Sequence, residues 1–201
     1  SGLDGGVDAG PLPDRSSDVE VALGSTIAEV DPRFVSVAVD SVQLVGGTFW
    51  DPSGTSTGTT GDYPVPPYDF GSEKLRRLAA ELAPALLRLG GTDADLLYYD
   101  LSDSPREEPP QGYEWVMTRA QWDGVHDFLQ ATGFELMFTL NAGPGPRDAD
   151  GRWDSTQART LLSYAATEGQ EVAVWELGNE PNGYRLIHGI DPDAPGHAAA
   201  Y

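Results

Sequence analysis

Residues 171–180 read EVAVWELGNE, and this stretch indicates how the rest of the chain folds. Apolar side chains alternate along it as far as Leu177, which is the pattern of a β-strand with one face in a core. A glycine then ends the predicted strand at 171–178, and Asn179 and Glu180 follow at once. Polar side chains directly after a strand are typical of parallel α/β proteins, whose sites lie at the carboxyl ends of the strands.

Three other segments have the same design. Strands are predicted at residues 34–40 (FVSVAVD), 85–89 (ALLRL) and 134–140 (FELMFTL), and a shorter one at 19–23 (VEVAL). The three longer strands also end close to side chains that can bind or react, namely Asp40, Thr92 and Asn141. Each long strand of the chain therefore finishes beside a candidate site residue.

Helices are predicted between the long strands, at about residues 75–82, 118–132 and 155–168, where apolar residues recur at helical spacing. Each is preceded or opened by a serine or threonine that can cap its amino terminus. Glycine- and proline-rich or acidic loops are predicted at 46–71 and 93–114. This alternation of strands and helices predicts parallel strand pairing.

One face of each long strand is apolar, whereas the other face mixes small and polar side chains. A doubly wound sheet would be apolar on both faces. The pattern therefore favours an α/β fold that is the first half, about four β/α units, of a TIM (β/α)8 barrel. By the same parity Arg88 and Glu176 both point inside the barrel, and we expect them to form a buried, hydrogen-bonded ion pair that supports the site.

Composition excludes several classes of protein. The 201 residues include 32 acidic and 12 basic ones, for a net charge of −20, which disfavours nucleic acid as a partner. No apolar run reaches the ~18 residues of a membrane-spanning helix. The absence of cysteine excludes disulfides, thiol catalysis and cysteine-ligated metals. No metal-ligand spacing, P-loop, GxGxxG or GxSxG motif occurs, so neither a metal nor a cofactor is expected.

The pair Asn179-Glu180 suits the hydrolysis of glycosides. A partly desolvated glutamate has a raised pKa and can protonate a leaving oxygen, while a neighbouring asparagine can donate a hydrogen bond to the sugar 2-OH. The other interpretation is that Asn179-Glu180-Pro181 only ends a strand and starts a turn. The chemistry of these residues alone favours neither.

Four stretches resemble a known family. Residues 175–182 (WELGNEPN) are similar to the acid/base motif of the retaining (β/α)8 glycosidases, in the heparanase-like form of glycoside hydrolase family 79. Residues 31–40 (DPRF and the strand up to Asp40), 87–92 (LRLGGT, with the loop that follows) and 138–142 (FTLNA) resemble its first three strands, in the same order.

The resemblance implies roles for individual residues. Glu180 would be the general acid/base and Asn179 the partner of the 2-OH group. Asp40, Gly91 and Thr92 would line the −1 subsite, where this family recognises glucuronic acid. A last residue, Asn141, would belong to the wall of the site. The substrate would be an oligo- or polysaccharide with β-glucuronide linkages, and the high acidity of the chain disfavours heavily sulfated ones.

The resemblance also implies a domain plan. Residues 1–18 would be a disordered leader, 19–29 a strand of a β-sandwich, and 30–201 the amino-terminal half of the barrel, with the rest of both domains and the nucleophile outside this chain. The fragment alone would be inactive. A Gly/Asp/Pro-rich leader often follows a removed export signal or lipid anchor, so we expect a secreted or cell-surface protein.

Two alternatives remain open. The chain could belong to a non-catalytic carbohydrate-binding or scaffold protein with a relic cleft. It could also belong to another glycosidase of the same clan that acts on a different sugar.

Overall fold

The computed structural model describes residues 24, 26, 28–49 and 63–190, and every structural statement below refers to them. Residues 1–30 and 31–201 are separate units, and all the helices and strands assigned lie in the second. The predicted leader at 1–18 and strand at 19–23 lie outside the described residues.

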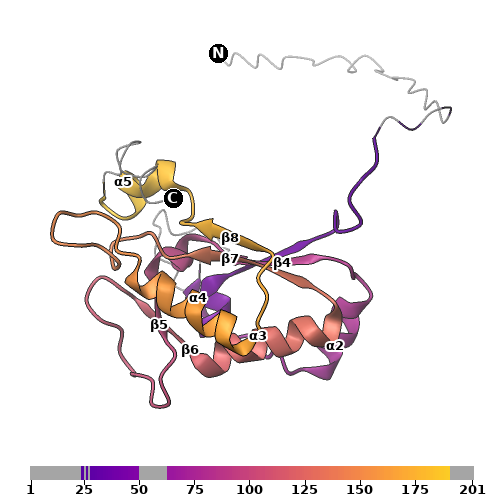
Figure 1. Cartoon of the computed structure of the whole chain (residues 1–201), viewed down its shortest axis with the longest axis horizontal. Coiled ribbons are helices and arrows are strands. Elements are labelled where there is room, and N and C mark those ends of the chain that lie inside the picture. The colour runs from indigo at the N-terminus through magenta and orange to yellow at the C-terminus, as the bar shows by residue number, and fades with distance from the viewer. Residues whose placement is uncertain (1–23, 25, 27, 50–62, 191–201) are drawn as a thin grey trace, which may run out of the picture. The chain divides into compact units, whose positions relative to one another are not determined.

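Four parallel strands form the central sheet (Figure 1). They are β1 (Val37–Asp40), β4 (Leu86–Gly90), β7 (Glu135–Leu140) and β8 (Val174–Leu177), in this spatial order. The predicted parallel pairing is therefore confirmed. The register places Asp40 beside Gly90 and Thr139 beside Glu176, so that the carboxyl ends of all four strands meet at one edge.

Three helices connect the strands: α2 (Glu73–Ala80), α3 (Arg119–Thr132) and α4 (Thr156–Glu168). They lie on one side of the sheet (Figure 1). The core lies between, where the apolar faces of β4 and β7 pack on α3; Leu87, Leu89, Leu136, Phe138 and Trp122 are all 2% exposed or less. The predicted division of each strand into an apolar and a polar face is the reason for this one-sided packing.

Helix ends follow the predicted signals, with one exception. Thr118 forms a capping box with Gln121 at the start of α3, and Gly133 ends that helix in a left-handed conformation. At the start of α4, however, the Ser155 side chain makes no capping hydrogen bond. Asp154 accepts instead, from the backbone N–H and the hydroxyl group of Thr156, because its longer side chain reaches the first turn.

Two predicted strands are too long. The first begins at Val37 rather than at residue 34, because Asp31–Phe34 form a turn in which the Phe34 N–H bonds to the Asp31 carbonyl. Phe34 itself is 77% exposed. The fourth strand covers only Val174–Leu177 of the predicted 171–178.

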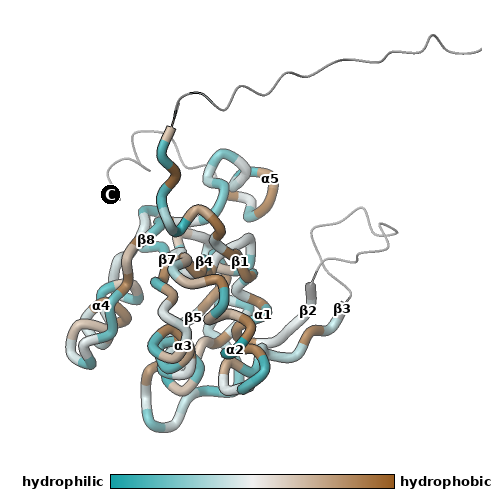
Figure 2. The backbone as a smooth tube through the Cα atoms, turned by 90° about the vertical axis from the view of Figure 1, so that its right-hand side faces the viewer, coloured by the Kyte–Doolittle hydropathy of each residue, from teal (hydrophilic) through white to brown (hydrophobic). Residues whose placement is uncertain are grey.

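Both predicted loops contain secondary structure. The first holds an antiparallel hairpin, β2 (Gly47–Phe49) and β3 (Tyr63–Val65), which projects from the rest of the unit (Figure 2), and a short helix, α1 (Ser41–Val45), precedes it. The second begins with a 3-10 helix, η1 (Thr92–Leu96), and strand β5 (Leu97–Asp100), which pairs with β6 (Trp115–Thr118). The acidic loop is thus confined to residues 101–114.

The chain continues after β8 through a second 3-10 helix, η2 (Pro181–Gly183), and α5 (Tyr184–Ile187). Within the described part of the chain, no helix has both the length and the apolar character needed to cross a membrane.

Candidate active site

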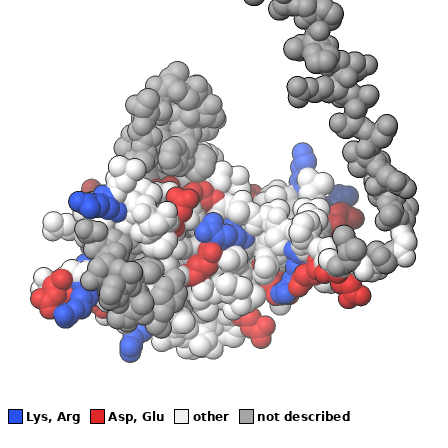
Figure 3. All heavy atoms as spheres, turned by 90° about the horizontal axis from the view of Figure 1, so that it is seen from above, with Lys and Arg blue, Asp and Glu red and all other residues white. Residues whose placement is uncertain are grey.

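Polar side chains on the face of the sheet opposite the helices form a connected network. Arg88 of β4 donates from Nε to Glu176 Oε2 of β8 at 2.8 Å, and Thr139 of β7 donates its hydroxyl to the same oxygen at 2.6 Å. Figure 3 views the molecule from this side, with acidic and basic side chains next to one another. The predicted ion pair is therefore present, bridged by the strand between its partners.

This network extends to the candidate site. The Arg88 guanidinium also donates from Nη2 to Asn179 Oδ1 at 3.2 Å. Gly90 makes room for it, because a Cβ atom there would lie 2.7 Å from the Arg88 guanidinium carbon and 2.5 Å from the Thr139 hydroxyl. The Arg88 and Glu176 side chains are 30% and 26% exposed, so the pair is half-buried rather than buried as predicted. The further strands that would complete the predicted barrel are not among the described residues.

Asp40 ends β1 and caps α1. Its Oδ1 accepts from the Val42 N–H, and a Cβ atom on Gly91 would lie 1.9 Å from its Oδ2. Gly91 has φ 88°, so only glycine fits both the conformation and the space. Burial, together with the neighbouring Asp93 carboxyl group to which Asp40 is hydrogen-bonded, raises the pKa of Asp40 to about 6, although the hydrogen bond from the Val42 N–H opposes this.

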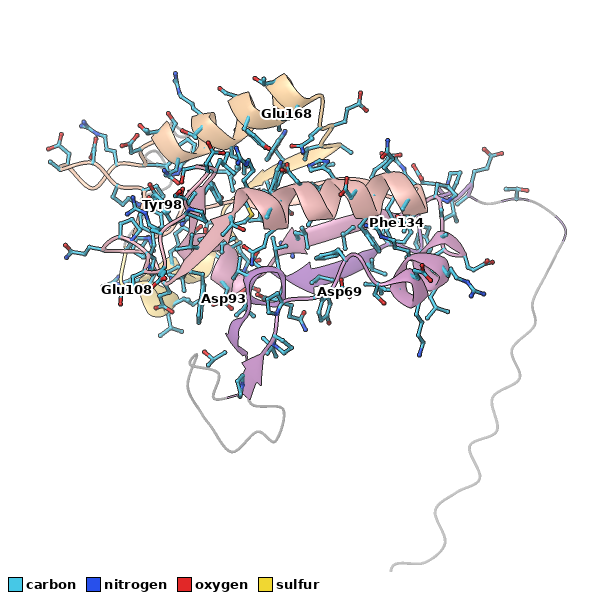
Figure 4. All side chains as sticks on the ribbon, turned by 90° about the horizontal axis from the view of Figure 1, so that it is seen from below. Asp69, Asp93, Tyr98, Glu108, Phe134 and Glu168 are labelled. Carbon is cyan, nitrogen blue, oxygen red and sulfur yellow. The ribbon has the colours of Figure 1, made fainter. Side chains whose placement is uncertain are left out.

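Asp93, which the sequence analysis did not single out, is the second carboxyl group of this corner. It lies in η1, toward the opposite end of the sheet from Phe134 (Figure 4). Trp115 Nε1 donates to its Oδ1 at 2.9 Å. Burial raises the pKa of Asp93 above its usual range, although the hydrogen bond from Trp115 opposes this. The corner therefore holds two desolvated carboxyl groups in direct contact.

Asp95, also missed, is fully buried and connects three strand ends. Its Oδ1 accepts from the Ala142 N–H after β7, and its Oδ2 accepts from the Asn179 N–H after β8, both at 2.9 Å. His188 Nε2 lies 3.7 Å from the same Oδ2. Three acidic residues in the short segment 93–100 were a signal in the sequence, but nothing there distinguishes the buried one.

The remaining predicted residues occupy different surroundings. Asn141 is buried, and both ends of its side chain bind backbone: Nδ2 donates to the Leu97 carbonyl, and Oδ1 accepts from the Gly143 N–H. Its contacts are those of a residue that holds β5 against the end of β7. Thr92 is the first residue of η1 and is half-buried.

Glu180 is exposed and directly follows Asn179. It has φ 48° and ψ 55°, and it is the one described residue other than glycine with a positive φ. Such a conformation is unfavourable for a residue with a side chain and persists where the surroundings impose it. The described residues do not supply the partial burial that the sequence analysis expected for this carboxyl group.

Two other features bear on the chemistry. Among the described residues, no group of three or more histidine, aspartate or glutamate side chains is arranged to hold a metal ion. A hollow of about 880 Å³ lies at the other end of the sheet, where α3 and α4 end and β7 begins. It contains none of the predicted site residues, which are all at the carboxyl ends of the strands.

An arrangement of asparagine, glutamate, aspartate and arginine at the carboxyl edge of a parallel sheet is typical of the sites of α/β enzymes. Comparison with known proteins identifies the family. Residues 18–197 match the glycosyl hydrolase family 79, N-terminal domain. The chain therefore belongs to glycosyl hydrolase family 79.

Individual relatives agree with this assignment. The chain is 29% identical to mouse heparanase and 27% identical to the baicalin-beta-D-glucuronidase of Scutellaria baicalensis, over 89% and 83% of its own length. It is also 40% identical to the mouse inactive heparanase-2, over 37% of its length. The aligned part covers 38% of the heparanase, so the chain spans a little over a third of that relative.

Proposed function

We propose that this chain supplies the acid/base half of a retaining glycoside hydrolase that acts on β-glucuronide-containing glycans, with Glu180 as the general acid/base. The observation that carries the proposal is the hydrogen bond from Arg88 to Asn179 Oδ1. It orients the Asn179 amide so that Nδ2 can donate to the sugar 2-OH beside Glu180, a contact that strengthens in the oxocarbenium-like transition state.

The other site residues have roles in the same proposal. Asp40, Gly91 and Thr92 would line the −1 subsite, and Asn141 would support its wall. Arg88 and Glu176 would hold Asn179 in place. The nucleophile would be a carboxylate about 5–5.5 Å from Glu180 in the assembled site. No aspartate or glutamate of this chain is assigned to it.

The one-sided sheet supports the proposed architecture. Residues 30–201 would form the first half of a (β/α)8 barrel, whose interior is the face that carries Arg88, Thr139 and Glu176. Residues 19–29 would belong to a β-sandwich and residues 1–18 to a leader. Secretion or display at the cell surface stays a prediction.

The choice of substrate rests on the relatives and on charge. Two relatives are named as a heparanase and a β-glucuronidase. The Asp40–Asp93 corner and the net charge of −20 disfavour polyanions, so we propose a glucuronide with few or no sulfate groups.

The test is the variant Glu180→Gln in the protein produced from its complete coding sequence. A glutamine cannot donate the proton, so kcat on glucuronides with poor leaving groups should fall by roughly 10²–10⁴. Activated aryl glucuronides need less protonation and should be affected less. The matched control is Glu135→Gln, whose carboxylate pairs with Arg33 at the other end of the sheet. Unchanged turnover of both substrate types would overturn the proposal.

A second candidate is a non-catalytic carbohydrate-binding protein. The similarity to an inactive heparanase-2 and the exposure of Glu180 favour it. It predicts saccharide binding without hydrolysis by the complete gene product. The coding sequence downstream of Tyr201 distinguishes the two, because a hydrolase needs further β/α units and a glutamate at the end of a strand there. A panel of aryl glycosides separates a glucuronidase from a related enzyme with another sugar.

A further inference from the structure

Asp95 is an acidic residue that is held mainly by backbone N–H groups, with the side chains of Tyr184 and His188 beside it. It is 0% exposed, and its two oxygens accept from two backbone N–H groups, those of Ala142 and Asn179. His188 Nε2 also lies 3.7 Å from Asp95 Oδ2, and the His188 side chain is only 3% exposed. Burying an acidic side chain is costly, so net stability is a poor explanation for the position of Asp95.

The position of Asp95 gives it control over the strand ends. It comes from η1, which follows β4, and it reaches the first residues after β7 and β8. The contact is close, since a Cβ atom on Gly143 would lie 2.1 Å from the Asp95 carbonyl oxygen. One side chain therefore joins the carboxyl ends of three of the four strands.

The bond to Asn179 acts on the backbone that carries the candidate acid/base. Glu180 holds its positive φ between two fixed points. On one side the Asn179 N–H is held by Asp95, and on the other the Glu180 carbonyl accepts from the Gly183 N–H at 2.7 Å. Just before them, Gly178 turns with φ 73°, and a Cβ atom there would collide with the Tyr184 hydroxyl group.

We propose that Asp95 is a positioning residue: by holding the Asn179 N–H it sets the direction in which the Asn179 and Glu180 side chains meet the saccharide. The inference rests on the proposed function of Glu180. The hydrogen bond from Asp95 reaches the backbone N–H of Asn179, so its effect on the two side chains is exerted through the backbone.

The first test is Asp95→Asn in the protein produced from its complete coding sequence. The amide has nearly the same shape but only one acceptor oxygen, so one of the two N–H groups faces an NH₂ group instead. A misplaced acid should lower kcat on poor leaving groups by roughly 10- to 100-fold, with a smaller change in KM and a smaller loss on activated aryl glucuronides. In the background of Glu180→Gln, where there is no acid to position, this extra loss should disappear.

The matched control is Asp100→Asn. Asp100 ends β5 and also accepts from two backbone N–H groups, those of Ser102 and Arg106. In the described residues its hydrogen bonds do not reach the residues that follow β7 and β8. If Asp95→Asn and Asp100→Asn change kcat equally, Asp95 is only structural and the proposal is wrong. If Glu180→Gln keeps full activity, the proposed function itself has failed, which is a different result.

A second measurement needs no variant and therefore does not depend on whether Asp95→Asn folds. The backbone N–H of Asn179 in the wild-type protein should exchange its hydrogen with deuterium at least ~100-fold more slowly than an unstructured backbone N–H, because the buried Asp95 side chain accepts its hydrogen bond. Exchange at the unstructured rate would overturn the proposal.

Discussion

Two aspartates at opposite ends of β1 have opposite pKa shifts, because the amino and carboxyl edges of the sheet, where the strands begin and end, place charged groups in different surroundings. Asp31 precedes the strand, is exposed, and pairs with Arg33 at 3.0 Å, so that hydrogen bonds from Arg33 lower its pKa to about 2. Asp40 ends the strand, where burial and the Asp93 carboxyl group raise its pKa to about 6. One type of residue thus has opposite shifts nine positions apart.

The other charged residues at each edge show the same difference in solvent exposure and partners. At the amino edge, Arg33 also pairs with Glu135 of β7 in contact with water. At the carboxyl edge, Asp40, Asp93 and Asp95 are crowded and desolvated, and their partners are mostly N–H groups. An edge that keeps carboxyl groups in unfavourable surroundings is a candidate site, because chemistry needs such pKa shifts and stability does not.

Among the substitutions that test this difference between the two ends of the sheet, Gly91→Ala should have the largest effect on stability. The new methyl group would overlap Asp40 at a residue whose φ is 88°, so we expect a loss of about 3 kcal/mol in the free energy of unfolding. Gly169→Ala at the end of α4 is the control, since its φ is 66° and nothing lies within 4 Å. It should cost only ~1 kcal/mol. Equal urea midpoints for the two variants would contradict the close contact with Asp40.

A smaller effect concerns pH. The pKa of Asp40 is about 6 in the folded protein and about 3.9 in an unfolded chain. The folded state therefore holds the proton more tightly, and the stability contributed by the protonated group is complete below pH ~4 and lost as the pH rises through 6. Asp40→Asn keeps an acceptor for the Val42 N–H and removes this dependence.

The measurement is the urea unfolding of both proteins at pH 4.5 and 7.5. The variant should lose about 1–2 kcal/mol less than the wild type between the two values, after allowance for solvent screening. A difference of the opposite sign would mean that Asp40 is stabilised as a carboxylate.

The smallest effect is expected from Asp31→Asn. The ion pair with Arg33 is exposed and surface pairs contribute little, so the urea midpoint at neutral pH should not change measurably. NMR titration of the wild type should nevertheless give Asp31 a pKa of about 2. A large loss of stability in this variant would show that the amino edge is not as tolerant as the comparison implies.

Much of the fold could be predicted because it depends on local patterns. Periodicity located β4 and β7, helical spacing and caps located α3, and the parity of Arg88 and Glu176 predicted their contact. The hairpin and the β5–β6 pair were missed because three or four residues are too few for a clear period. Strand ends were misplaced where a turn such as Asp31–Phe34 interrupts an apolar run.

The sequence by itself determined the order of the four long strands and of the three helices between them, and the side of each long strand that enters the core. It also determined the position of Asn179-Glu180 after the fourth long strand. Periodicity and capping act between near neighbours in the chain, which is why these features could be predicted. Only the tertiary structure decided which of the clustered aspartates are buried. Asp93 contacts Asp40. Asp95 accepts hydrogen bonds from the N–H groups of Ala142 and Asn179, which lie 47 and 84 residues further along the chain. Burial and hydrogen bonding depend on what folds against a residue, and in this loop three aspartates of equal chemistry at 93, 95 and 100 acquire different surroundings.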